Sequence, residues 1–145
     1  MQKTIGILGG GQLGKMLFEA GSPLNISYTF LEGKEGCPAS LVCKNQLVGS
    51  LQDAEKINAL ARKSDVLSFE IEHVNVDALK ELEAQGKTVI PKPDVLSIIQ
   101  DKGLQKQFYH DHHIPTLDFT IASVEGLSAA VDNWEEDRFV LKHRK

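Results

Sequence analysis

The sequence lacks long apolar runs and has few cysteines. No stretch approaches the roughly 20 consecutive apolar residues that a membrane-spanning helix needs. The first residues lead directly into a strand pattern and do not resemble a signal peptide. The two cysteines, Cys37 and Cys43, are not spaced like zinc ligands. Few thiols and no secretion signal are typical of a reducing compartment, so we predict a cytoplasmic protein without membrane contact.

An excess of positive charge is also missing. The chain has 16 Lys+Arg and 20 Asp+Glu, which gives a net charge of −4. Proteins that bind nucleic acids need a basic surface that displaces counterions, so we expect no nucleic-acid partner. The hydrophobic fraction of 41% and charged fraction of 25% are typical of a globular domain with a core, so we do not expect an intrinsically disordered chain.

Strand patterns and helical periods alternate along the first part of the chain. The predicted strands cover residues 3–8, 26–31, 47–48, 66–71 and 88–90. In the first helical stretch the apolar residues Leu13, Met16, Leu17 and Ala20 recur at helical spacing and give one apolar face. Asp53 is a predicted N-cap for the next helix. This alternation predicts an α/β fold, a Rossmann-like doubly wound parallel sheet over residues 1–92.

The pattern changes after residue 92. Helices are predicted from Pro93 onward and over residues 101–111, and another through Val124 and Trp134. Strands are predicted at residues 117–122 and 138–142. A strand at the chain end needs neighbours. We therefore interpret residues 93–145 as linker helices and the start of a second domain, and we expect the natural protein to continue beyond Lys145.

A glycine-rich loop follows the first predicted strand. The segment from Gly9 to Gly14 contains G-x-G-x-x-G and opens a predicted helix. Glycines allow a tight turn, and the amides of the following helix attract an anion, for which phosphate is the natural candidate. Dinucleotide-binding domains add an acidic residue about 20 positions further on, a place that Glu32 could take. The loop alone therefore leaves an NAD-binding domain open.

Two carboxylates follow the fourth predicted strand. Glu70 and Glu72 lie at its carboxyl end, where ligands bind in parallel sheets. The two-residue period of a strand places both carboxylates on the same side, with Phe69 and Ile71 on the opposite side. Such a pair suits the hydroxyl or amine groups of a sugar or an aminated ring. A solvated strand end without a ligand is the alternative interpretation.

Several stretches, taken together, resemble one family. They are the loop with its continuation to Met16, F-E-I-E at 69–72, I-I-Q-D-K-G-L-Q-K at 98–106, H-I-P-T at 113–116 and V-L-K at 140–142. In this order the chain resembles, over nearly its whole length, the N5-carboxyaminoimidazole ribonucleotide synthetases of the ATP-grasp superfamily. Lys15 stands where the family usually has arginine, and His113 stands where it has glycine. A helix end of that kind commonly adopts a left-handed conformation.

The resemblance implies roles for particular residues. Residues 1–92 would form the pre-ATP-grasp substrate-binding domain, and residues 93–145 the linker and the truncated start of an ATP-grasp domain. Lys102 and Lys142 match positions that contact ATP. The positions that match substrate contacts are Gly11, Gln12, Leu13, Glu70 and, more weakly, Glu72.

The resemblance also implies a reaction. Such enzymes use ATP, Mg²⁺ and bicarbonate to carboxylate aminoimidazole ribonucleotide in de novo purine biosynthesis, through a carboxyphosphate intermediate, and the full-length protein would be a homodimer. The phosphate lid and the metal ligands are expected beyond Lys145. We therefore assign no catalytic residue and no metal ligand within the chain, and we predict that the chain alone is inactive as a ligase.

Other functions remain open at this point. A formate-using glycinamide ribonucleotide transformylase shares the layout but typically has Glu-Leu where this chain has Gln12 and Leu13. An NAD(P)-binding dehydrogenase domain does not explain the segment at 98–106. A nucleotide-sensing module would end near Ile90. The histidines at 110, 112 and 113 are not expected to bind metal, because neighbouring helical residues point in different directions.

Overall fold

The computed structural model describes residues 3–135 and 138–145. Contacts divide the chain into two compact units, Met1–Ser97 and Ile98–Lys145. Among the described residues, no helix is both long and apolar enough to cross a membrane.

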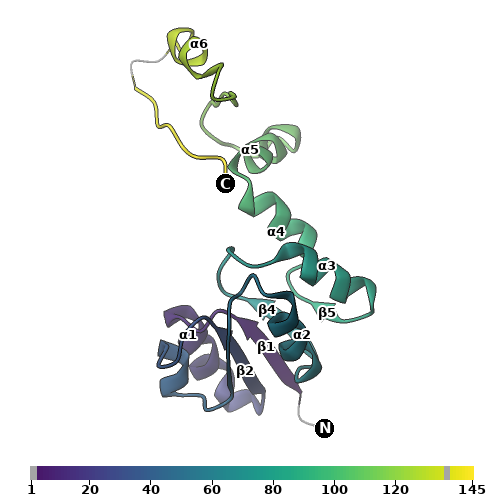
Figure 1. The fold of residues 1–145 in the computed structure, drawn as a ribbon. Helices are drawn as coiled ribbons and strands as arrows, with labels where there is room; N and C mark the ends of the chain where they lie inside the picture. Colours follow the sequence, from purple (N-terminus) through teal and green to yellow (C-terminus); the bar gives the residue numbers. More distant parts are fainter. Residues whose placement is uncertain (1–2, 136–137) are drawn as a thin grey trace. The chain divides into compact units, whose positions relative to one another are not determined.

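The first unit is built on a five-stranded parallel sheet (Figure 1). Its strands are β1 (Thr4–Leu8), β2 (Ser27–Glu32), β3 (Gln46–Val48), β4 (Val66–Phe69) and β5 (Thr88–Val89). Their order is β3-β2-β1-β4-β5, with every neighbouring pair parallel. The chain moves outward from β1 on one side and then crosses to the other side for β4. This confirms the predicted Rossmann-like α/β sheet.

Helices cover both faces of the sheet. The helices are α1 (Gln12–Gly21), α2 (Ala54–Arg62) and α3 (Val76–Ala84), with short 3₁₀ turns η1 (Ser22–Leu24) and η2 (Pro38–Leu41). One apolar cluster joins Ile7 and Phe30 of the sheet to Phe18 of α1 and Ala39 of η2. A second cluster joins the opposite face to α2 and α3, through Ile57, Leu60, Ala61, Leu79 and Leu82. The sheet is therefore doubly wound.

The apolar face predicted for α1 is largely exposed and does not pack on the sheet. The exposed fractions of Leu13, Met16 and Leu17 are 57%, 53% and 43%. The helix instead approaches the sheet through its glycines: a Cβ at Gly21 would lie 1.9 Å from the Tyr28 hydroxyl oxygen. Periodicity locates an apolar stripe, but close contact through small residues can turn a different side of a helix toward the sheet.

The start of α2 follows the sequence prediction. One carboxylate oxygen of Asp53 accepts hydrogen bonds from the Glu55 and Lys56 amides, at 2.9 and 3.3 Å. This side chain replaces acceptors that the first turn of a helix lacks. The predicted N-cap is thereby confirmed.

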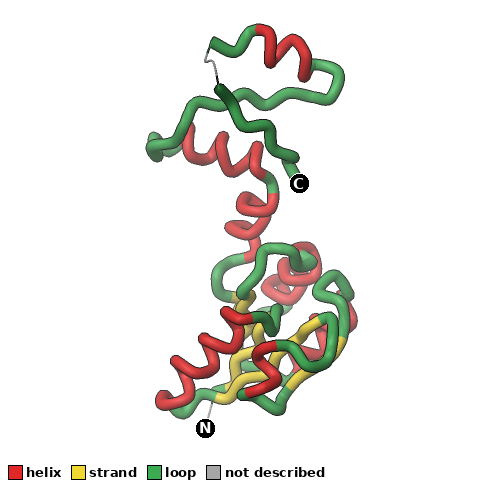
Figure 2. The backbone as a smooth tube through the Cα atoms, turned by 90° about the vertical axis from the view of Figure 1, so that its left-hand side faces the viewer, coloured by secondary structure: helices red, strands yellow, loops and turns green. Residues whose placement is uncertain are grey.

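The remaining helices are α4 (Pro93–Gln100), α5 (Lys102–Asp111) and α6 (Leu127–Asp132). The strands predicted at 117–122 and 138–142 are wrong, since both segments are irregular backbone (Figure 2). A strand needs a partner for its ladder of hydrogen bonds, and within the described residues neither segment has one. The helix predicted through Val124 and Trp134 is shorter, and both residues lie outside α6.

The end of α5 shows the conformation that the family glycine would suit. His113 has a φ of 54°, in the left-handed region. Its amide donates to the His110 carbonyl at 3.1 Å, and the Ile114 amide donates to the Tyr109 carbonyl at 2.8 Å. These bonds close the helix as glycine-ended helices do, although histidine tolerates the conformation less well.

Candidate functional site

The glycine loop lies where the direction of strand crossing reverses. Leu8, the last residue of β1, is paired with Leu31 of β2 on one side and with Phe69 of β4 on the other. Gly9, Glu32 and Glu70 are therefore neighbours at the carboxyl edge of the sheet. This edge, at the switch between β1 and β4, is where open parallel sheets bind their ligands.

Glu70 caps α1 from a distance. Its carboxylate accepts from the Gly11 amide at 2.7 Å and from the Gly14 amide at 3.2 Å. Gly11 is the N-cap of α1 and has no side chain to supply this acceptor, so a residue 59 positions further on supplies it. A carboxylate at a helix amino terminus is also favoured by the helix dipole. In the structure, a carboxylate thus accepts the hydrogen bonds of the loop amides for which the sequence suggested a phosphate.

Glu32 holds the other side of the loop. Its two carboxylate oxygens accept from the Gly10 amide at 2.9 Å and from the Gly33 amide at 2.7 Å. The Ala39 amide of η2 donates to the Gly10 carbonyl at 3.0 Å. The sequence suggested Glu32 only as a ribose ligand in the dinucleotide alternative. Its position at the end of β2, beside β1, is the signal that could have identified it as a partner of the loop.

The loop glycines make room for these carboxylates. Gly9 has a φ of 100°, and a Cβ there would lie 2.6 Å from Cγ of Glu70. A Cβ at Gly11 would lie 2.9 Å from the Glu70 Oε1 atom, and one at Gly10 would lie 2.8 Å from the buried Cys37 sulfur. Side chains at these positions would displace Glu70 or the loop. The glycines therefore allow the Glu70 and Cys37 side chains to approach the loop backbone closely, and they also allow the turn itself.

Gln12 and Leu13 lie in the first turn of α1, next to the amides that Glu70 caps. Both residues are exposed. Among the described residues, the structure gives their backbone amides no hydrogen-bond acceptor. The predicted substrate residues Gly11, Gln12, Leu13 and Glu70 are thus brought together at one end of α1.

Glu72 is placed differently from Glu70. Because β4 ends at Phe69, the two-residue period of a strand does not extend to either carboxylate, and the expectation of a shared strand face is wrong. Glu72 lies in the turn that follows β4, with its Oε1 atom 3.7 Å from Nε2 of His73. Glu72 therefore faces a different neighbour, while Glu70 is fixed to the loop.

The two predicted ATP-contacting lysines lie in the second unit. Lys102 begins α5, its Nζ atom donates to the Ile99 carbonyl at 3.3 Å, and its amide donates to the Arg144 carbonyl at 2.8 Å. Lys142 is exposed in irregular backbone, two positions before Arg144. The Arg144 Nε atom lies 2.6 and 2.9 Å from the two carboxylate oxygens of Asp101, the N-cap of α5. These bonds hold the segment that carries Lys142 at the start of α5.

The pair of Asp101 and Arg144 predicts a pH-dependent attachment. The hydrogen bond from Arg144, assisted by the Leu104 and Gly103 amides, holds the pKa of Asp101 below its ordinary value of 3.8. A depressed carboxylate pKa contributes stability above the unfolded value, and this contribution is lost as the pH falls through the folded value. We therefore expect the Asp101 carboxyl to titrate with a midpoint below 3.8, together with the Gly103 amide, in NMR spectra recorded from pH 6 to pH 2.

The matched variants are Arg144→Ala and, for an exposed arginine outside this pair, Arg138→Ala. The first should raise the Asp101 midpoint, and the second should leave it unchanged. An Asp101 midpoint at or above 3.8 in the unaltered chain would contradict the ion pair.

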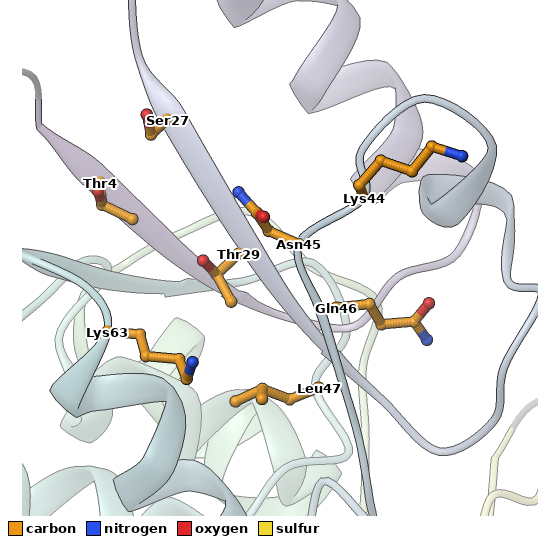
Figure 3. A pocket seen from close by; sticks show the side chains of 8 residues that line it. All are labelled: Thr4, Ser27, Thr29, Lys44, Asn45, Gln46, Leu47 and Lys63. Carbon is orange, nitrogen blue, oxygen red and sulfur yellow. The ribbon is translucent and has the colours of Figure 1, made fainter.

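A polar groove lies elsewhere in the first unit (Figure 3). Its volume is about 450 Å³. Thr4 of β1 and Ser27 and Thr29 of β2 lie along it, and Lys63 reaches it from the end of α2. None of the predicted site residues lines this groove. In the described part of the chain, no group of three or more His, Cys, Asp or Glu side chains could hold a metal ion.

The doubly wound sheet, with a glycine loop and an anchored carboxylate at its switch point, defines a ligand-binding α/β domain of the nucleotide-binding class. The ribonucleotide synthetase preATP-grasp domain family matches residues 1–100. The chain therefore belongs to this family.

Individual relatives agree with this assignment. The chain is 38% identical over 142 residues to the chloroplastic phosphoribosylaminoimidazole carboxylase of Vigna aconitifolia, covering 98% of this chain and 25% of that protein. It is 37% identical over 142 residues to the N5-carboxyaminoimidazole ribonucleotide synthase of Brucella melitensis, covering 98% of this chain and 39% of that protein. The chain thus spans about a quarter to two fifths of the length of these curated relatives.

Solved structures show the same likeness. The N5-carboxyaminoimidazole ribonucleotide synthetase of Thermotoga maritima superimposes with a TM-score of 0.83 at 35% identity, covering 92% of this chain and 37% of that one. The N5-carboxyaminoimidazole synthase of Aspergillus clavatus, solved with ADP and 5-aminoimidazole ribonucleotide, gives a TM-score of 0.74 at 34% identity and covers 81% and 31%. The resemblance noted in the sequence is confirmed, and the dehydrogenase and nucleotide-sensing alternatives are not favoured.

Proposed function

We propose that the chain provides the substrate-binding part of an ATP-dependent carbon–nitrogen ligase. That enzyme carboxylates aminoimidazole ribonucleotide with bicarbonate to N5-carboxyaminoimidazole ribonucleotide in de novo purine biosynthesis. The observation that carries the proposal is the Glu70 carboxylate, which is fixed at the switch point by the Gly11 and Gly14 amides. Membership of the preATP-grasp family, and a relative solved with this ribonucleotide, support it.

The chemistry of Glu70 suits this substrate. An ionised carboxylate offers about four acceptor sites on its two oxygens. Each Glu70 oxygen accepts one loop amide, so acceptor capacity remains on both. Aminoimidazole ribonucleotide presents ribose hydroxyls and an exocyclic amine, all of which donate. We place these donors at Glu70, with Gly11, Gln12 and Leu13 beside them and Glu72 as a weaker contact.

The second unit carries the proposed ATP contacts. Lys102 and Lys142 are cations on neighbouring segments, and ammonium groups bind phosphate through charge-assisted hydrogen bonds. We take residues 1–92 as the substrate domain and residues 93–145 as the linker and the beginning of the ATP-grasp domain. The metal ligands of the proposed enzyme are expected beyond Lys145, and we assign none within the chain. The use of bicarbonate, a homodimeric full-length enzyme and a cytoplasmic location complete the proposal.

Glu70 can be tested against Glu72. Glu70→Gln removes the charge and one acceptor, while the remaining amide oxygen can still accept from the loop. Hydrogen bonds to charged groups contribute about 1.5–3 kcal/mol, so we expect the dissociation constant for aminoimidazole ribonucleotide to rise about tenfold or more, as measured by isothermal titration calorimetry.

Glu72→Gln provides the matched control, with the same change of charge two positions away. We expect its dissociation constant to rise less than about threefold, because the Gly11 and Gly14 amides donate to Glu70, whereas the Glu72 carboxylate lies 3.7 Å from Nε2 of His73. Equal losses in the two variants, or none in either, would count against the proposed role of Glu70.

A further inference from the structure

Two carboxylates occupy the amides of the glycine loop from within the chain. Glu32 takes the Gly10 amide at 2.9 Å, and Glu70 takes the Gly11 and Gly14 amides at 2.7 and 3.2 Å. In a dinucleotide-binding loop these amides and the helix dipole attract a pyrophosphate. Here the same attraction is already satisfied by protein carboxylates.

We propose that Glu32 is a positioning residue that, together with Glu70, makes this loop exclude phosphate groups and accept donor groups instead. The inference rests on the proposed function, because it states which part of the ribonucleotide the loop admits. Glu32 reaches the loop from β2, on the side of β1 opposite Glu70, so the two carboxylates hold the loop from both sides. The Gly10 and Gly11 amides that they take are consecutive.

The electrostatic argument concerns like charges. Two like charges a few ångströms apart repel each other several times more strongly at the edge of a protein than in bulk water, because the effective dielectric constant there is lower. A phosphate that entered the loop would face two such repulsions and would also have to displace both carboxylates from their amides. A hydroxyl or amine donor meets no repulsion, and it finds acceptor capacity on both oxygens of Glu70.

The loop carbonyl supports the positioning role of Glu32. While Glu32 accepts from the Gly10 amide, the Ala39 amide donates to the Gly10 carbonyl at 3.0 Å. Both sides of this glycine are therefore fixed, which orients the following amide of Gly11 toward Glu70. Glu32 acts on the ligand through the loop and through its charge, and the structure gives it no catalytic role.

The test is an amide NMR titration of the 145-residue chain with inorganic pyrophosphate. In the unaltered chain we expect the amide resonances of Gly10, Gly11 and Gly14 to remain unchanged when pyrophosphate is added. In Glu32→Ala these amides should shift, with an apparent affinity for pyrophosphate at least about tenfold higher. Glu35→Ala is the charge-matched control, since Glu35 is exposed nearby, and it should behave like the unaltered chain.

Glu32→Gln separates charge from geometry, because the glutamine oxygen can still accept from Gly10. This variant should keep the native Gly10 amide resonance yet bind pyrophosphate more tightly than the unaltered chain. The proposal is overturned if pyrophosphate shifts the loop amides equally in the unaltered chain and in both Glu32 variants, or if Glu35→Ala gives the same gain. A failure of aminoimidazole ribonucleotide to bind the unaltered chain, measured separately, would count against the proposed function and not against this result.

Discussion

Replacing Gly9 with alanine should lower the free energy of unfolding by about 3 kcal/mol, the sum of backbone strain and a lost helix cap. Gly9 has a φ of 100°, which residues with a side chain rarely adopt, so the substitution strains the backbone whatever space is available. The added Cβ would also lie 2.6 Å from Cγ and 2.8 Å from Oε1 of Glu70. The Glu70 carboxylate would have to leave the Gly11 and Gly14 amides, and α1 would lose its cap. Urea denaturation followed by circular dichroism measures the change.

The matched control is Gly36→Ala. Gly36 also has a positive φ, of 72°, but a Cβ there would meet nothing within 4 Å. This variant carries the backbone strain alone, and we expect a loss of about 1 kcal/mol. The Gly9 variant should also lose affinity for aminoimidazole ribonucleotide, whereas the Gly36 variant should keep it. Equal destabilisation by both substitutions would mean that the clash of the added Cβ at Gly9 with Glu70 does not affect stability.

Replacing Leu60 with alanine should cost about 3 kcal/mol, within the usual range for a buried leucine that leaves a cavity. Leu60 of α2 is fully buried. It packs directly against the central strand, since a Cβ at Gly6 of β1 would lie only 2.9 Å from its Cγ atom. The same denaturation experiment measures the loss.

Leu41→Ala makes the same change at a leucine that is 75% exposed. Exposed substitutions of this kind usually change stability by less than about 0.5 kcal/mol. A Leu60 variant as stable as the Leu41 variant would contradict the packing of α2 on the sheet.

The elements that the sequence predicted well depend on local chemistry. Asp53 caps α2 because its carboxylate meets amides two and three residues away, and that interaction is visible in the residue order. The strand, glycine loop and helix at the start of the chain likewise follow from adjacent residues. The parallel direction of the strands follows from their alternation with helices.

The errors concern interactions between distant residues. The exposure of Leu13 and Met16 depends on how closely Gly21 approaches Tyr28, which no periodicity in α1 records. The strands expected at 117–122 and 138–142 needed partners that the described residues do not provide.

The candidate site shows both kinds of outcome. Family resemblance and the end of a strand predict Glu70 as a site residue. Its bond to Gly11, across 59 positions, comes only from the fold. The spacing of Glu32 from the loop indicates a ribose ligand, because spacing alone does not reveal that the Gly10 amide is its neighbour.

The most direct test of the proposed ligand site is an amide NMR titration of the chain with aminoimidazole ribonucleotide and, separately, with NADH. We predict that the ribonucleotide shifts the resonances from Gly11 to Gly14 and that of Glu70 in a saturable manner, while NADH leaves them in place. Saturable shifts from NADH at Gly9 to Gly14 and at Glu32, with none from the ribonucleotide, would contradict the assignment of this loop to a ribonucleotide substrate.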